Sequence, residues 1–181
     1  MTPTARRAYG ELDREQVVAS LYTLARRVGV QRVTMRELAA ELGVAVPSVY
    51  YHVPGKQAAL ELLAESVLAG IAVPDDGPWD DQLAELYCSA REVILAVPGL
   101  AGVLQISGGG ESARRLDRLS RSLLAAAGLP KSVAAASHTV LYTYLLGSVS
   151  LEEARGKRGA ASRFRAGLNV IIAGIKASEG E

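Results

Sequence analysis

The chain has 181 residues, enough for one medium domain or for a small domain joined to a larger one. Hydrophobic residues make up 49% of it and charged residues 22%, which excludes an intrinsically disordered chain. The formal net charge of +1 argues against a protein whose entire surface binds nucleic acid, although it leaves room for a local basic face.

The sequence lacks the signals of a membrane or secreted protein. It contains no uncharged apolar run of about 18 residues, so we expect no membrane-spanning helix. Its first residues are basic and lead into a polar stretch, where a signal peptide would place an apolar run. We therefore expect a cytoplasmic protein that has no membrane partner.

Residues that carry enzyme chemistry are scarce. Cys88 is the only cysteine, which excludes an internal disulfide and a multi-cysteine zinc site. The two histidines, His52 and His138, have no neighbours in the sequence that complete a Ser/His/Asp set or a metal-ligand spacing. We expect no enzymatic activity, no metal and no cofactor.

Helical periodicity, interrupted by glycine and proline, predicts an all-α protein. In the first part of the chain the predicted helices span residues 13–28, 34–42, 47–52 and 56–72. Thr34 and Glu37 form a capping box at the start of the second helix, and Gly43 ends it. Pro47 suits the first turn of the third helix.

A loop rich in helix breakers, residues 73–78, marks the boundary between two domains. Longer helices are predicted after it, at residues 79–97, 99–106, 111–127, 130–154 and 160–177. The division that we expect is a DNA-binding unit at 1–55, a connecting helix at 56–72 and a second helical domain at 73–181.

The segment from Thr34 to Leu60 carries the functional signal. A short capped helix is followed by Gly43, a turn of about three residues and a second short helix, with Val49 facing inward. This is the layout of a helix-turn-helix, whose second helix enters the major groove of DNA. The outward side of that helix offers two tyrosines and small groups rather than an ordinary charged face, which favours contacts to phosphates and base edges.

The same residues resemble the DNA-binding domain of TetR-family transcriptional regulators. The similarity lies in Leu42-Gly43-Val44, in Val49-Tyr50-Tyr51-His52-Val53, and in Lys56 with Ala59-Leu60 behind it. The run from Pro47 to Val53 is similar to the tetracycline repressor branch in particular. The resemblance extends over about residues 13–68, which include the first three predicted helices and most of the fourth.

The resemblance implies a set of DNA-binding residues: Thr34, Arg36, Val46, Pro47, Ser48, Tyr50, Tyr51, His52 and Lys56. Residues at the start of the recognition helix would contact bases, and Tyr50, His52 and Lys56 would bind phosphates. Arg36 would contact a base or a phosphate near the groove edge, and Thr34 would cap its helix and also reach a phosphate. The alternatives are that the tyrosines are ordinary partly buried aromatics and that Lys56 and Arg36 are solvated surface charges.

One residue departs from the tetracycline repressor pattern. Val46 stands where that branch has an amide side chain, and valine cannot make the bidentate contact to adenine. We therefore expect an operator different from that of the tetracycline repressors. The same departure leaves open a helical interaction protein, or a ligand-independent regulator with degenerate DNA reading.

The C-terminal half is similar to the family by architecture more than by motif. The resemblance implies a domain that binds a ligand and forms a homodimer, with the last two long helices of each subunit in a four-helix bundle. Those helices carry more apolar surface than one side of a small domain needs, which is typical of an interface. The predicted interface residues are Leu141, Tyr144, Leu145, Ser148, Phe164, Gly167, Leu168, Ile171, Gly174 and Ile175.

A ligand cavity is expected between the long helices. Its candidate lining residues are polar or large groups on otherwise apolar helices: Tyr87, Arg91, Leu104, Gln105, His138 and Tyr142. His138 is also compatible with a hydrogen-bonded core or interface histidine, and Arg91 with a surface ion pair.

These predictions combine into one function. We expect a homodimeric one-component transcriptional regulator, a repressor, that binds a near-palindromic operator in double-stranded DNA. A small, largely apolar effector in the C-terminal cavity would shift the population away from the state that binds DNA. An enzyme built on this fold is a further alternative, which the missing catalytic residues disfavour.

Overall fold

The computed structural model describes residues 12–107, 110–156 and 158–178. Within these ranges the regular secondary structure is entirely helical. The all-α prediction is therefore confirmed. Residues 1–11 of the predicted DNA-binding unit lie outside the described part of the chain.

The N-terminal helices form close to their predicted positions, and side chains cap two of them. They are α1 (Arg14–Val28), a short 3-10 helix η1 (Val30–Arg32), α2 (Met35–Leu42), α3 (Val46–His52) and α4 (Lys56–Ala69). Asp13 caps α1, since its carboxylate accepts the backbone N–H of Gln16 at 2.7 Å. The predicted capping box of Thr34 and Glu37 is present at the start of α2.

The C-terminal helices are α5 (Trp79–Leu95), α6 (Leu100–Ser107), α7 (Glu111–Ala126), α8 (Lys131–Arg155) and α9 (Ala160–Ala177). Their bounds lie close to the predicted ones. The prediction placed the end of α4 at residue 72, but the helix ends at Ala69, because Gly70 follows and the backbone N–H of Ala72 donates to Ser89 instead. The 3-10 helix η1 was not predicted, because its three residues are too few to show a period.

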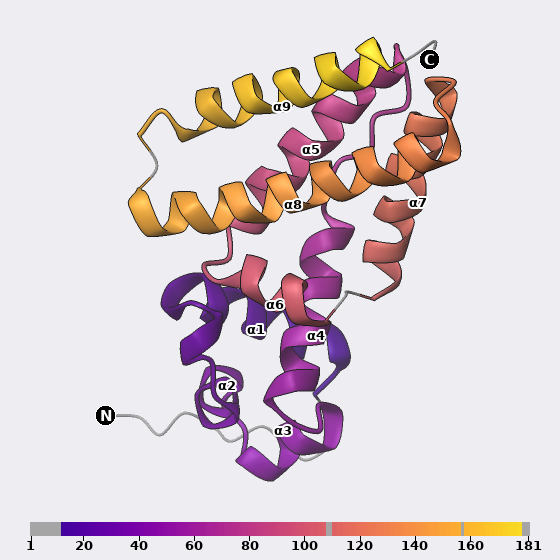
Figure 1. Cartoon of the computed structure of the whole chain (residues 1–181). Helices are drawn as coiled ribbons and strands as arrows, with labels where there is room; N and C mark the ends of the chain where they lie inside the picture. The colour runs from indigo at the N-terminus through magenta and orange to yellow at the C-terminus, as the bar shows by residue number, and fades with distance from the viewer. Residues whose placement is uncertain (1–11, 108–109, 157, 179–181) are drawn as a thin grey trace.

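The molecule is elongated, and different groups of helices form its two ends (Figure 1). The α2–α3 pair lies at one end, and α8 and α9 lie side by side at the opposite end. Helix α4 runs between the two ends and contacts α1, α5, α6 and α7. It therefore joins the two ends of the molecule, together with the contact between η1 and the loop before α6, where the N–H of Val30 donates to the carbonyl of Pro98.

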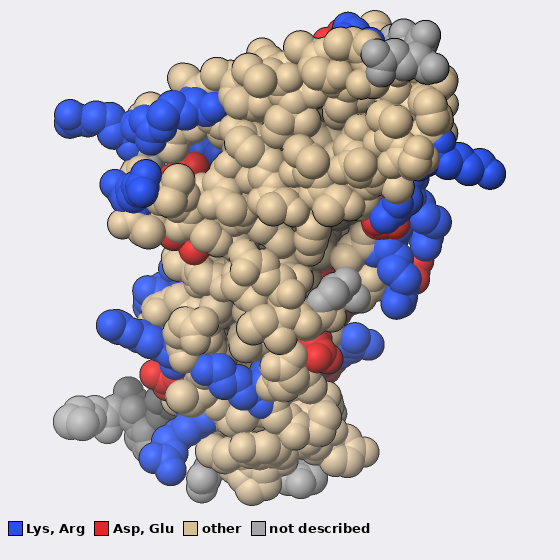
Figure 2. All heavy atoms as spheres, viewed as in Figure 1, with Lys and Arg blue, Asp and Glu red and all other residues tan. Residues whose placement is uncertain are grey.

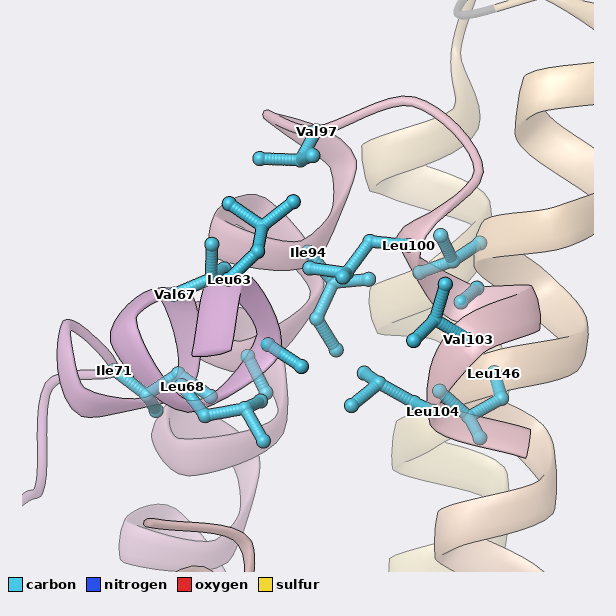
Figure 3. Close-up of a cluster of buried hydrophobic side chains, with 14 of the residues drawn as sticks. Leu63, Val67, Leu68, Ile71, Ile94, Val97, Leu100, Val103, Leu104 and Leu146 are labelled. Atoms are coloured by element: carbon cyan, nitrogen blue, oxygen red, sulfur yellow. The ribbon is translucent and has the colours of Figure 1, made fainter. Parts of the chain in front are cut away.

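Apolar side chains hold this connection together (Figure 3). Leu63 and Leu68 of α4 face a cluster formed by side chains of α5, α6 and α8, among them Ile94, Leu100 and Leu146. Leu63 and Leu100 are fully buried, and Ile94 retains 1% of its surface. Because interiors are close-packed, a displacement of α4 cannot leave α5 and α6 unaffected.

Among the described residues, no single helix is long and apolar enough to cross a membrane. Helices α5 and α6 pass such a test of length and composition when taken together, but the chain bends by 113° between them.

Candidate DNA-binding surface and ligand cavity

The recognition helix α3 is anchored by one side and exposed on the other. Val49 is completely buried against the core of the N-terminal helices. Tyr50 and Tyr51 expose 48% and 83% of their surface, and Pro47 and His52 are exposed beside them. A large exposed aromatic such as Tyr51 is unusual on a purely structural helix. The exposed side of α3 is thus available to a partner.

The turn between α2 and α3 fixes the direction of the recognition helix. Gly43 adopts a left-handed conformation with φ 69°, and its N–H bonds back to the end of α2. On α2, Arg36 is exposed. Val46 and Ser48, both predicted to contact bases, are only partly exposed at the start of α3.

Two predicted phosphate-binding groups already have partners within the chain. The Lys56 ammonium donates to the carbonyl of Gln31 at 2.7 Å, which leaves two of its three N–H groups available. The Thr34 hydroxyl bonds to the carboxylate of Glu37 at 2.9 Å. Lys56 is also the first residue of α4, where no side chain caps the free N–H groups. The start of α4 is therefore suited to an anion.

An internal cavity of about 390 Å³ lies between α4, α5, α6, α7 and α8. Four of the six predicted residues line it: Tyr87, Leu104, His138 and Tyr142. Most of the other lining residues are apolar: Leu68, Ile71, Leu86, Ala90, Ile94, Ala113, Leu116, Leu145 and Leu146. The cavity thus suits an apolar molecule that makes few polar contacts.

Two of the predicted cavity residues do not line the cavity. Gln105 is exposed on α6. The Arg91 guanidinium is buried in a bidentate ion pair with Glu152 of α8, with N–O distances of 2.7 and 3.0 Å, and lies 5.6 Å from the ring centre of Phe164. The prediction for Arg91 is therefore wrong in both of its forms, because the residue faces neither the ligand cavity nor the surface.

The polar end of the cavity is a series of hydrogen bonds. The Tyr87 hydroxyl lies 3.1 Å from Ser120 Oγ, which lies 3.1 Å from His138 Nδ1. His138 Nε2 lies 2.7 Å from a carboxylate oxygen of Asp117, which also bonds Arg121. Sequence reasoning missed Ser120 and Asp117, because both lie on a helix that looked like a charged surface helix.

Burial and charge set the protonation of these groups. Desolvation lowers the pKa of His138, and the neighbouring Arg121 lowers it further. The hydrogen bond from Arg121 lowers the pKa of Asp117. Burial raises the pKa of Tyr87 to about 12. The series therefore contains a neutral imidazole, a carboxylate and a neutral phenol at neutral pH.

Ser120, His138 and Asp117 bring together the residue types of a hydrolytic triad, which the sequence analysis did not foresee. Ser120, however, lies in the middle of α7, so its own N–H is used within the helix rather than held out toward an oxyanion. Among the described residues there is also no group of three or more His, Cys, Asp or Glu side chains that could hold a metal ion. The arrangement suits ligand recognition better than acyl transfer.

The residues of the predicted dimer interface fall into two groups by their burial within a single chain. Leu141, Leu145, Phe164, Leu168 and Ile175 are at most 5% exposed and contribute to the core of the subunit, although Ile175 also lines a surface groove. The other five, which are Tyr144, Ser148, Gly167, Ile171 and Gly174, retain accessible surface. The interface stays a prediction, because a wide apolar band on a helix does not tell which part of it faces its own chain.

An apolar face nevertheless remains open on α8 and α9. Val140 exposes 51% and Val170 73% of its surface. A groove of about 490 Å³ runs between the two helices, and its lining contains no charged residue: Ser132, Val133, Ala136, Ser137, Val140, Val170, Ile171, Gly174, Ile175 and Ser178. Figure 2 shows lysine, arginine and acidic side chains toward the edges of this face rather than at its centre. Such a face is typical of an interface.

The exposed recognition helix behind a tight turn defines the N-terminal part as a helix-turn-helix, the DNA-reading unit of many regulators. Residues 19–65 match "Bacterial regulatory proteins, tetR family", and residues 73–163 match "Tetracyclin repressor-like, C-terminal domain". The chain therefore belongs to the TetR family of transcriptional regulators. Proteins of this family are helix-turn-helix transcriptional regulators.

Individual proteins agree with this assignment. An HTH-type transcriptional regulator from Saccharopolyspora erythraea is 31% identical over 146 residues, which cover 78% of this chain and 61% of that protein. The match thus spans less than two thirds of that relative's length.

Solved structures are similar over nearly the whole chain. A TetR variant from Acinetobacter baumannii AYE, in complex with minocycline, has a TM-score of 0.84 at 27% identity, with 94% of this chain and 100% of that chain covered. BioQ with its natural double-stranded DNA operator has a TM-score of 0.81 at 26% identity, with 92% and 99% covered.

Proposed function

We propose that this protein is a homodimeric repressor that binds a near-palindromic operator and releases it when a small, largely apolar molecule fills the internal cavity. The observation that carries the proposal is the exposed face of α3 at one end of α4, combined with an apolar cavity at the other end of the same helix.

The DNA contacts are divided by position. Pro47 and the partly exposed Val46 and Ser48 contact base edges, with apolar contacts to thymine methyl groups. Tyr50, His52 and Lys56 bind phosphates, and Lys56 is assisted by the uncapped N–H groups of α4. Tyr51 packs against the DNA backbone or a base methyl group, Arg36 contacts a base or a phosphate near the groove edge, and Thr34 reaches a phosphate.

Dimerisation places two recognition helices on one operator. The uncharged groove between α8 and α9 pairs with the same surface of a second copy, so that four helices form a bundle. Two-fold symmetry then requires two half-sites about 34 Å apart, or a multiple of this spacing, on one face of the duplex.

Helix α4 connects the ligand to the DNA. Leu68 in its last turn and Ile71 just after it line the cavity, whereas Lys56 begins the helix beside α3. Glu65, between these points, accepts hydrogen bonds from the backbone N–H and the hydroxyl of Ser112 at 3.0 and 2.7 Å, which ties α4 to the start of α7. A ligand that moves the end of α4 therefore displaces α3. The ligand releases the operator by favouring a spacing of the two recognition helices that does not fit the DNA.

We assign the chain three parts on this basis: residues 1–55 for DNA binding, residues 56–72 as the connection, and residues 73–181 for the effector and the dimer. The operator of a bacterial regulator lies in the cytoplasm, so we place the protein there.

The test is selection from a pool of random duplexes at low salt, with the dimer verified beforehand. Enrichment of a palindrome is expected, and recovery of no palindrome by a folded dimer contradicts the proposal. Lys56→Ala should weaken binding to every duplex alike and lower the salt dependence by about one unit of slope, since one phosphate contact is lost. A change in preferred bases instead would show that Lys56 reads sequence.

A further inference from the structure

The hydrogen-bond series from Tyr87 to Asp117 has a fixed direction when His138 is neutral. The Asp117 carboxylate can only accept, so His138 Nε2 carries the proton that lies between them. Nδ1 is then an acceptor and must receive the hydroxyl proton of Ser120. Ser120 Oγ in turn accepts from Tyr87. In this state the Tyr87 hydroxyl donates its proton to Ser120, so the phenol oxygen can only accept a hydrogen bond from a ligand.

The direction reverses when His138 carries a second proton. Nδ1–H then donates to Ser120, and the hydroxyl of Ser120 donates to the oxygen of Tyr87. The Tyr87 hydroxyl then no longer donates to Ser120, and it can donate a hydrogen bond to a ligand instead. The same four residues therefore present an acceptor or a donor to the cavity, according to the protonation of one imidazole.

We propose that this end of the cavity binds a largely apolar ligand that carries one acidic hydroxyl group, such as a phenol or an enol, and that the ligand is bound together with its proton. Tyr87 recognises the ligand, because its hydroxyl bonds directly to the ligand hydroxyl. Ser120, His138 and Asp117 are positioning residues that set whether Tyr87 donates or accepts. The inference rests on the proposed use of this cavity for the effector.

An acidic hydroxyl is satisfied in both states of the series. As a neutral group it donates its proton to Tyr87. As an anion it accepts the proton of Tyr87, because the ligand proton has moved to Tyr87, that of Tyr87 to Ser120, and that of Ser120 to His138 Nδ1. The shift leaves the net charge of the complex unchanged, because the negative charge on the ligand is balanced by the positive charge on His138. An ether or a ketone can only accept, and it therefore requires a proton taken separately from solvent.

The charges around His138 are compatible with both states. Asp117 and Arg121 of α7 lie closest, and the carboxylate partly offsets the guanidinium. Arg114, also of α7, and Tyr142 of α8 line the same cavity, as does Tyr87 of α5. The cavity residues from α4 and α6 are apolar. A bound anion would restore the favourable environment for the imidazolium that burial alone removes.

The test uses 7-hydroxycoumarin, which ionises near neutral pH, and its methyl ether 7-methoxycoumarin. Binding to the full-length dimer is measured by fluorescence titration, and proton uptake by calorimetry in two buffers of different ionisation enthalpy. The hydroxyl compound should bind about tenfold more tightly or better. Above its ionisation pH, it should take up about one proton per subunit, since the anion enters with a proton.

Tyr87→Phe should remove the preference for the hydroxyl compound, whereas Tyr22→Phe, which removes a hydroxyl on α1, should retain it. Equal affinity for the two coumarins, binding of the anion without proton uptake, a preference that survives Tyr87→Phe, or binding of neither probe overturns the inference. The first two comparisons use the unmodified protein and do not depend on the folding of a variant. Operator binding without ligand is measured in parallel. Its absence counts against the proposed function, while the coumarin results stand by themselves.

Discussion

Arg91 of α5 and Glu152 of α8 form an ion pair buried inside the C-terminal part of the molecule. Their side chains are 9% and 6% exposed, and both carboxylate oxygens accept from the guanidinium. The pair fixes the relative position of two helices that also line the ligand cavity. Because burying two charges costs desolvation energy that their attraction must offset, the pair adds little net stability compared with apolar residues of the same size.

Removing one partner of this pair should be much worse than removing both. Arg91→Ala leaves the Glu152 carboxylate buried without its partner and should lower the free energy of unfolding by about 3–5 kcal/mol. The double variant Arg91→Met, Glu152→Leu should recover most of that loss, because no uncompensated charge remains. Urea denaturation measures both. A double variant as unstable as Arg91→Ala would show that packing around the pair, rather than charge, determines its effect.

The pair also illustrates the limit of prediction from the sequence. The helices and the helix-turn-helix were predictable because their signals are local: Thr34 and Glu37 are three residues apart, and Gly43 follows directly. Arg91 and Glu152 are 61 residues apart, so no local pattern connects them.

The residues of the cavity and of the interface could be predicted only in part. Tyr87 and His138 were predicted because a polar group on an apolar helix is conspicuous, but Ser120 sits among arginines and could not be distinguished from a surface residue. On α9, apolar residues point both inward and outward. Leu168 faces the core and Val170 the surface, and only the packing of α8 and α5 decides between them.

The contact between α4 and α7 should be detectable as a local change in stability. The N-cap residue of α7, Gly110, has no side chain to bond the free N–H groups, and Glu65 of α4 accepts the N–H of Ser112 instead. Glu65→Ala should therefore lower the free energy of unfolding by about 1 kcal/mol, as the loss of a helix cap does. Hydrogen exchange should accelerate in the first turn of α7. Glu61→Ala is the matched control on the same helix, because Glu61 is exposed and accepts a hydrogen bond from Gln57 of its own helix at 3.0 Å. Equal exchange in both variants would refute a capping role.

Stability should fall in mild acid because of His138. Its pKa is lowered in the folded protein, so the unfolded chain binds the proton more readily. The stability that the neutral imidazole contributes is therefore complete above its ordinary pKa of 6.5 and is lost as the pH falls below it. The slope that this single group can add is at most about 1.4 kcal/mol per pH unit.

His138→Gln should flatten that slope, even though the variant also loses hydrogen bonds and is less stable at neutral pH. Denaturation by urea at several pH values between neutrality and pH 5 measures the slope directly. His52→Gln, at the exposed histidine of α3, is the control for the substitution itself. An unchanged slope in His138→Gln would assign the acid sensitivity to other groups.

The face of α8 and α9 should be the surface on which two subunits meet. Val170 is 73% exposed in the single chain, and a side chain added at Gly174 would meet no atom within 4 Å. Val170→Glu and Gly174→Glu should therefore leave the subunit folded. In the dimer, each would bury two like charges in an uncharged groove, at a cost of several kcal/mol. Sedimentation should show monomers, with operator affinity reduced because a monomer holds only one half-site.

Ser122→Glu provides the comparison, since it adds the same charge on the exposed side of α7, away from the groove. That variant should remain dimeric and bind the operator as before. If both Val170→Glu and Gly174→Glu sediment as dimers, the subunits associate through another surface. The spacing of the two recognition helices would then have to be derived from that surface instead.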